Sequence, residues 1–263
     1  MKGSRRVLLR RVAWLLSLAA AFGLCVDDHP AARAADAADA AHAPAADCTE
    51  DAMLVFDASG SMASAGYNEL NIPRIVEALD AVREVLPEVE RYRRIGLVSY
   101  GPGRGASCTN IRLHLPPRVS AARQIIDELE RITPDGDTPL TEAVRQAAEA
   151  LDYRRRPATV VLVTDGDETC AGEPCRLAAE LVRDGARLTV HVIGFKVRDR
   201  FFEWGSVTRE SRRGEVASRC LADRTGGHFV STDTTEELVG ALRRTLGCPV
   251  VTGRGAPATL LSR

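Results

Sequence analysis

The stretch M-L-V-F-D-A-S-G-S-M, residues 53–62, decides how the rest of the chain is interpreted. Its apolar first half is typical of a buried strand, and its second half is a small turn rich in oxygen atoms. Asp57, Ser59 and Ser61 occupy alternating positions in that turn. Hard cations such as Mg²⁺ take oxygen ligands and usually keep some waters. The stretch therefore predicts part of a cation site whose missing ligands lie downstream.

Strand and helix patterns alternate after this turn. Helical spacing of apolar residues covers 72–86, 119–131, 140–151, 175–182, 215–224 and 235–246, and Pro87 is expected to end the first of these helices. Strand patterns cover 94–100, 111–115, 159–164, 188–195 and 227–231. Residues 196–213 lack a period and are expected to form a long loop or a short irregular helix.

This alternation predicts an α/β fold, a doubly wound and mostly parallel sheet with helices on both faces. Residues 159–164 form the most β-branched run and are expected at the centre of the sheet. Residues 111–115 alternate between apolar and polar side chains, as in a half-exposed edge strand that runs antiparallel to its neighbour.

Oxygen-bearing residues recur where other segments end. Asp165 follows the strand at 159–164, and Thr138 stands at a helix start. Loops that leave the carboxyl ends of parallel strands meet at a topological switch point, so ligands from separate strands can converge there. Taken singly, Ser59 and Ser61 are also explained as a turn and helix cap, and Asp165-Gly166 as a turn dipeptide.

Together, D-x-S-x-S at residues 57–61, Thr138 in D-T-P-L and Asp165 in T-D-G resemble the von Willebrand factor type A (VWA) domain and its metal-ion-dependent adhesion site. The resemblance covers residues 48–248. It implies a Rossmann-like fold and a divalent cation, usually Mg²⁺, with Mn²⁺ or Ca²⁺ as alternatives. It further implies that Ser59, Ser61 and Thr138 bind the metal directly, and that Asp57 and Asp165 bind it directly or through water.

The same resemblance implies that a protein partner supplies an Asp or Glu carboxylate to the metal. Residues 165–170, with Cys175 beyond them, resemble an exported bacterial branch of the family. Asp137 departs from the pattern, because a small or neutral residue is expected before Thr138. If Asp137 reached the metal, it would weaken the attraction for a foreign carboxylate.

The first 34 residues have the pattern of a cleaved export signal, with five basic residues before an apolar run at 12–24 and a small-x-small site at 32–34. The run is shorter than the roughly 20 residues of a membrane span, so an uncleaved anchor is the weaker alternative. Whether export follows the general or the twin-arginine route stays open. We expect a disordered linker at 35–47, a flexible tail at 249–263 and a periplasmic or extracellular location.

Charge and cysteine content agree with this view. The formal charge is −1, and removal of the signal would leave 29 basic and 34 acidic residues, which argues against a nucleic-acid surface. Six cysteines would remain, an even number typical of disulfides in an exported protein. Cys48 and Cys248 bracket the domain and are expected to pair. The spacing of Cys170 and Cys175 does not fit a structural zinc site.

Enzymatic function is not expected. The nucleophile motif G-x-S-x-G and a phosphate loop with lysine are both missing from the sequence. A metal-dependent phosphatase would need further carboxylates, for which Asp137, Asp167 and Glu168 are the candidates. The hypothesis is a non-enzymatic, exported, metal-dependent protein-binding domain. The alternatives are a hydrolase that uses the same metal and a structural subunit whose metal stabilises the fold.

Overall fold

A computed structural model describes residues 50–65, 71–102, 107–166, 168–197 and 218–247. The predicted signal, linker and C-terminal tail lie outside these ranges, and so does most of the predicted loop at 196–213. Cys48 and Cys248 lie outside them as well, so their predicted pairing stays a prediction.

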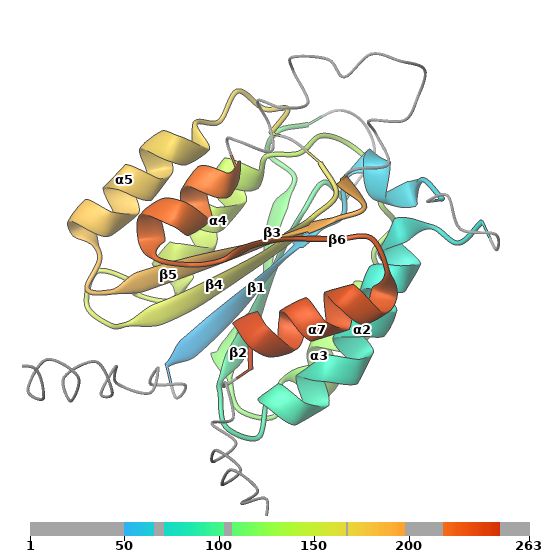
Figure 1. Cartoon of the computed structure of the whole chain (residues 1–263), viewed down its shortest axis with the longest axis horizontal. Coiled ribbons are helices and arrows are strands. Elements are labelled where there is room, and N and C mark those ends of the chain that lie inside the picture. Colours follow the sequence, from blue (N-terminus) through green and yellow to red (C-terminus); the bar gives the residue numbers. More distant parts are fainter. Residues whose placement is uncertain (1–49, 66–70, 103–106, 167, 198–217, 248–263) are drawn as a thin grey trace, which may run out of the picture. The chain divides into compact units, whose positions relative to one another are not determined.

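The described strands form one sheet in the order β3-β2-β1-β4-β5-β6 (Figure 1). Neighbouring strands are parallel except for edge strand β3, which runs antiparallel to β2. This confirms the predicted fold class. The strands are β1 (Asp51–Asp57), β2 (Ile95–Tyr100), β3 (Ile111–Arg118), β4 (Ala158–Thr164), β5 (Leu188–Phe195) and β6 (Phe229–Thr232).

Helices cover both faces of the sheet (Figure 1). One apolar cluster lies between the sheet and α2 (Arg74–Val89), α3 (Ala122–Leu129) and α7 (Thr235–Thr245). The other lies against α4 (Leu140–Ala150), α5 (Pro174–Asp184) and the helical residues 218–225. The described helices include none with the length and apolar character needed to cross a membrane.

Strand sequences match this two-sided burial. Along β1, Met53 and Val55 belong to one cluster, whereas Leu54 and Phe56 belong to the other, because successive side chains point to opposite faces. All seven residues of β4 are buried, and β4 lies between β1 and β5. A strand with apolar neighbours on both faces favours a continuous β-branched run, which explains residues 159–164.

The predicted end of the first helix was wrong. Pro87 lies inside α2, which continues to Val89. Proline removes one amide donor, yet Leu86 and Val89 on either side are buried in the apolar cluster. Burial of these side chains in the last turn outweighs the loss of one helical hydrogen bond.

Two disulfides link described segments. Cys108 pairs with Cys170, and Cys175 pairs with Cys220. Cys170 and Cys175 therefore belong to different bridges, which agrees with the rejection of a zinc site made from that pair. The Cys108–Cys170 bridge joins the segment after β2 to the segment after β4, and both follow carboxyl ends of parallel strands.

The carboxyl ends of three strands lie level with one another. Asp57 at the end of β1 pairs with Tyr100 of β2, and Phe56 pairs with Val163 of β4. The chain order reverses between β1 and β4, which makes this edge the topological switch point. The sheet therefore places the turn after β1 beside the ends of β2 and β4.

Gly101 allows β2 to lie against that turn. Its φ is +91°, and a Cβ there would lie 2.5 Å from the Ser59 backbone nitrogen. Both the backbone conformation and the close approach exclude other residues.

We predict that Gly101→Ala destabilises the domain more than Gly226→Ala does. Gly226 has a similar φ of +74°, but a Cβ there meets nothing within 4 Å. The control variant should cost about 1–2 kcal/mol from backbone strain alone. Urea denaturation measures the unfolding free energy of both variants. Equal losses of unfolding free energy would show that the close approach of Gly101 to Ser59 is unimportant.

Candidate metal centre

Asp57 is the buried anchor of the site. Its side chain is fully buried at the end of β1. One carboxylate oxygen accepts the Ser59 backbone N–H at 2.8 Å, and the other accepts the Thr164 hydroxyl at 2.6 Å. The carboxylate therefore connects the turn after β1 with the end of β4.

The two serines converge on Asp165. A short 3₁₀ helix, η1 (Gly60–Ala63), follows β1, and Ser59 precedes it. The hydroxyls of Ser59 and Ser61 lie 3.1 Å apart, and the Ser61 hydroxyl donates to Asp165 Oδ1 at 2.6 Å. Asp165 is fully buried just beyond β4. The structure thus brings together four of the five predicted ligands.

Thr138 lies on an adjoining loop that is tied to this turn. The Gly60 N–H donates to the Gly136 carbonyl at 3.0 Å, and the Asp135 N–H donates to the Ala58 carbonyl at 3.0 Å. Thr138 itself is buried. Within the described residues, its hydroxyl has no hydrogen bond to the other four predicted ligands, so its approach to the metal stays a prediction.

Residues after Asp165 hold the Thr138 loop from the other side. The Thr138 N–H donates to the Thr169 hydroxyl at 2.8 Å, and the Thr169 N–H donates to the Thr138 carbonyl at 3.2 Å. Glu168 accepts N–H groups from Thr141 at 2.8 Å and from Cys170 at 2.9 Å. Because Thr141 lies in the first turn of α4, Glu168 caps that helix and both its carboxylate oxygens are engaged.

Asp137 points to the nearby disulfide. Its Oδ2 lies 4.0 Å from Cys108 Sγ, and it forms a cluster with Cys108 and Cys170. In the described part of the chain it makes no hydrogen bond to Asp57, Ser59, Ser61 or Asp165. Both sulfurs of that cluster are in a disulfide, so they are not available as thiolate ligands.

Burial and like charge raise the pKa of Asp57 to about 6. Burial is the larger cause, and the negative charge of Asp165 adds to it. Hydrogen bonds from Ser59 and Thr164 act in the opposite direction. Two buried carboxylates that repel each other are stabilised by any cation placed between them.

Arg74 is a charged residue at the candidate site that the sequence patterns did not single out. Its Nη1 lies 2.9 Å from Asp165 Oδ2 in an ion pair whose side chains are 8% and 0% exposed. The same nitrogen donates to the Ser61 carbonyl at 3.3 Å, while Nε is buried without a partner among the described residues. Arg74 begins α2, where the helix dipole disfavours a positive charge. This unfavourable placement of a positive charge is the sequence feature from which a nearby negative partner could have been inferred.

The donor set fits a small divalent cation. In octahedral coordination with metal–oxygen distances near 2.1 Å, adjacent ligands lie about 3 Å apart. The serine hydroxyls, 3.1 Å apart, already have this spacing. Carboxylate and hydroxyl oxygens are hard ligands that suit Mg²⁺, Mn²⁺ or Ca²⁺.

Comparison with known proteins supports a VWA domain. Residues 52–168 match the sequence model of the von Willebrand factor type A domain. The uncharacterized protein YwmC of Bacillus subtilis (strain 168) is 31% identical over 154 residues, which cover 56% of this chain and 66% of YwmC.

Solved structures share the fold. The pilus adhesin SpaC from Lactobacillus rhamnosus GG overlaps with a TM-score of 0.54 at 14% identity, over 75% of this chain and 30% of that chain. A von Willebrand factor type A protein from Catenulispora acidiphila overlaps with a TM-score of 0.52 at 16% identity, over 76% of this chain and 42% of that chain. The match thus spans less than half of each solved chain and just under two thirds of YwmC.

We predict that Asp57→Asn changes the pH dependence of stability in chelator. A folded-state pKa of about 6, above the usual 3.8, means that Asp57 favours folding at low pH and loses that effect as pH rises through 6. The unfolding free energy of the wild type, relative to the variant, should fall by roughly 2.4 kcal/mol between pH 4 and 7.5. Urea titrations across this range measure it. A constant difference would show that the pKa of Asp57 is not raised.

Proposed function

From the premise of a VWA domain, supported by the family match and the fold, we propose an exported, non-enzymatic binding module. It takes an acidic group of a protein partner at a divalent cation held by Asp57, Ser59, Ser61, Thr138 and Asp165. The observation that carries this proposal is the convergence of buried carboxylates and two hydroxyls at the switch point of the sheet. The bound cation would supply an open coordination position for the partner's carboxylate.

Charge explains why the partner should be acidic. Asp57 and Asp165 contribute two negative charges, and Arg74 contributes one positive charge. A divalent cation would leave an excess of one positive charge, which a single carboxylate from a partner neutralises. Ser59 and Ser61 are uncharged ligands and leave this excess unchanged.

Every proposed ligand is an oxygen, which suits a hard divalent cation such as Mg²⁺. Of the three further acidic candidates, Asp167 lies outside the described residues, and the other two have contacts of their own. Glu168 caps α4, and Asp137 lies against a disulfide. For Glu168 and Asp137, these contacts argue against binding of a second metal and against a role as general acid, which favours the non-enzymatic proposal over the hydrolase alternative. Two disulfides support an oxidising, exported location.

Metal binding should stabilise the domain. At a Mg²⁺ concentration one hundred times the Kd, binding adds about 2.7 kcal/mol. For a domain of this size, the melting temperature should rise by roughly 5–10 °C relative to EDTA. Differential scanning fluorimetry measures the shift.

Ser61→Ala and Asp57→Ala serve as paired variants for this measurement. Ser61→Ala removes one proposed ligand and keeps both carboxylates, so the fold should persist while the Mg²⁺ shift shrinks or disappears. If both variants showed the full wild-type shift, the metal would not bind at these residues.

Arg74→Met tests the charge balance. Loss of the guanidinium leaves Asp165 buried without its cation, so the variant should lose about 3–5 kcal/mol in EDTA. Divalent metal should then bind more tightly than to the wild type, because it meets one more negative charge. Isothermal titration with Mn²⁺ measures the affinity.

Arg93→Met is the matched control for Arg74→Met. Arg93 is equally buried, at 6% exposure, but lies before β2 at the opposite edge of the sheet, where it donates to the Leu246 carbonyl at 3.0 Å. Its loss should destabilise the fold without changing Mn²⁺ affinity. Unchanged affinity in Arg74→Met would show that Arg74 does not counterbalance the metal.

A further inference from the structure

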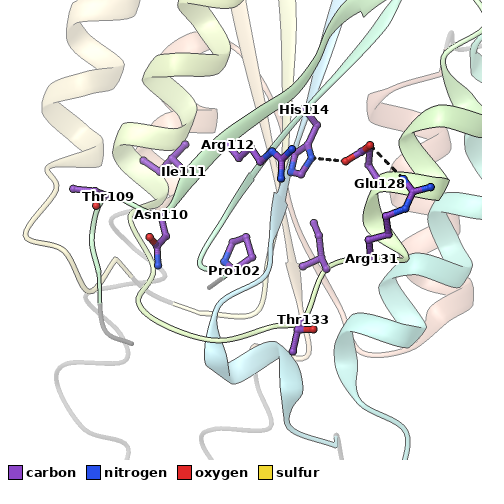
Figure 2. A pocket seen from close by; sticks show the side chains of 10 residues that line it. Pro102, Thr109, Asn110, Ile111, Arg112, His114, Glu128, Arg131 and Thr133 are labelled. Atoms are coloured by element: carbon purple, nitrogen blue, oxygen red, sulfur yellow. Dashed lines mark hydrogen bonds and ion pairs between the residues drawn. The ribbon is translucent and has the colours of Figure 1, made fainter. Parts of the chain in front are cut away.

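A cavity of about 680 Å³ lies between edge strand β3 and the end of α3 (Figure 2). Polar side chains make up much of its lining, and they come from the segment after β2, from β3 and from α3 with the residues that follow it. The lining residues are Pro102, Thr109, Asn110, Ile111, Arg112, His114, Glu128, Arg131, Ile132 and Thr133.

The cavity carries an excess of positive charge. Among the described lining residues, the charged ones are Arg112, Arg131 and a single carboxylate, Glu128. Arg131 donates to Glu128 at 3.3 Å and is 69% exposed. Arg112 is exposed and has no ion pair or side-chain hydrogen bond with any other described residue. Its guanidinium is therefore available to an anion.

His114 fixes Glu128 without adding charge. His114 Nδ1 lies 3.1 Å from a Glu128 oxygen, and Nε2 lies 2.8 Å from the Ser99 hydroxyl (Figure 2 shows the contact with Glu128). Burial lowers the pKa of His114 from its usual value, and the charge of Arg112 adds to this effect, although the contact with Glu128 opposes it, so the neutral imidazole is favoured at pH 7. A neutral ring donates from Nδ1 to the carboxylate and accepts from Ser99.

The row Ser99–His114–Glu128 has the hydrogen-bond order of a nucleophile triad, but Ser99 is fully buried. A substrate in the cavity cannot reach a hydroxyl that is not exposed to it. The hydrogen bonds from Ser99 through His114 instead fix the position of the Glu128 carboxylate in the cavity wall. Among the described charged residues of the lining, Arg112 is the one without an ion-pair or hydrogen-bond partner.

Two backbone segments connect the cavity with the metal site. Asn110 in the lining accepts the Gly101 N–H at 2.9 Å, and Gly101 packs against Ser59. Thr133 in the lining begins the loop whose Asp135 N–H donates to the Ala58 carbonyl. The cavity lining is therefore bonded to the segments that flank the proposed metal ligands, at the same edge of the sheet.

We propose that this cavity is a second subsite for the partner, which takes a further Asp or Glu side chain of the same acidic segment at Arg112. This inference rests on the proposed function, since it extends the ligand from the metal. The partner's recognition segment accordingly carries at least two acidic residues, one for the metal and one for the cavity.

Two synthetic peptides of equal length serve as probes: a glycine peptide with one central Asp, and its counterpart with three further Asp residues on either side of the centre. Backbone amide NMR spectra are recorded in saturating Mg²⁺ at millimolar peptide. The amides of Ser59 and Ser61 report on the metal site, and those of Asn110, Arg112 and Thr133 report on the cavity. The multiply acidic peptide should shift both groups of signals, whereas the single-Asp peptide should shift the metal-site signals alone.

Arg112→Ala should remove the cavity shifts and weaken the multiply acidic peptide roughly fivefold, while the single-Asp peptide keeps its affinity. Arg118→Ala is the matched control, because Arg118 is exposed on the same strand, donates to Gln124 and lies outside the cavity lining. It removes the same charge and should leave both affinities within about twofold.

The outcomes separate the two proposals. Metal-site shifts without Arg112-dependent cavity shifts overturn the second subsite and leave the proposed function standing. Arg112-dependent cavity shifts without metal-site shifts support the subsite and contradict the proposed function. The absence of shifts in both groups at millimolar peptide overturns both.

Discussion

The fold places two carboxylates, Asp57 and Asp165, at the ends of adjacent parallel strands and buries both. Burial, together with the negative charge of Asp165, raises the pKa of Asp57 to about 6. The surrounding residues compensate through hydrogen-bond donors and a guanidinium: Ser59, Thr164, Ser61 and Arg74 all contact one of the two carboxylates. A buried charge is tolerated only with such partners, and the same arrangement makes this edge of the sheet attractive to a cation.

Neighbouring loops hold this pair in place from several sides. Glu168 and Thr169 fix the start of α4 and the Thr138 loop, and the Cys108–Cys170 bridge ties these residues to the segment after β2. Gly101 lets β2 approach the turn after β1. These contacts explain why the turns after β1 and β4 and the loop between α3 and α4, far apart in sequence, are held together at one site. The same contacts connect the metal site to the cavity beside β3.

The sequence predicted features that depend on local pattern. Strands buried on both faces produce apolar runs, so the fold class and the central position of residues 159–164 could be predicted. Asp57, Ser59 and Ser61 form one short motif, the switch-point argument placed Asp165 and Thr138 near them, and the resemblance joined all five as one set of metal ligands. Features that depend on distant partners were missed: Arg74 contacts a residue 91 positions away, and Glu168 caps a helix 27 positions before it. The helix end predicted at Pro87 was wrong because burial of the neighbouring side chains outweighs the low helix propensity of proline.

The central claim is that Asp57, Ser59, Ser61, Thr138 and Asp165 hold one divalent cation. Its most direct test is an anomalous difference map from a crystal of the domain grown with Mn²⁺. The account predicts a peak within bonding distance of the Ser59 and Ser61 hydroxyls, with Thr138 in the same coordination shell. A fully occupied Mn²⁺ elsewhere, for example beside Asp137, with no peak at the two serines would contradict it.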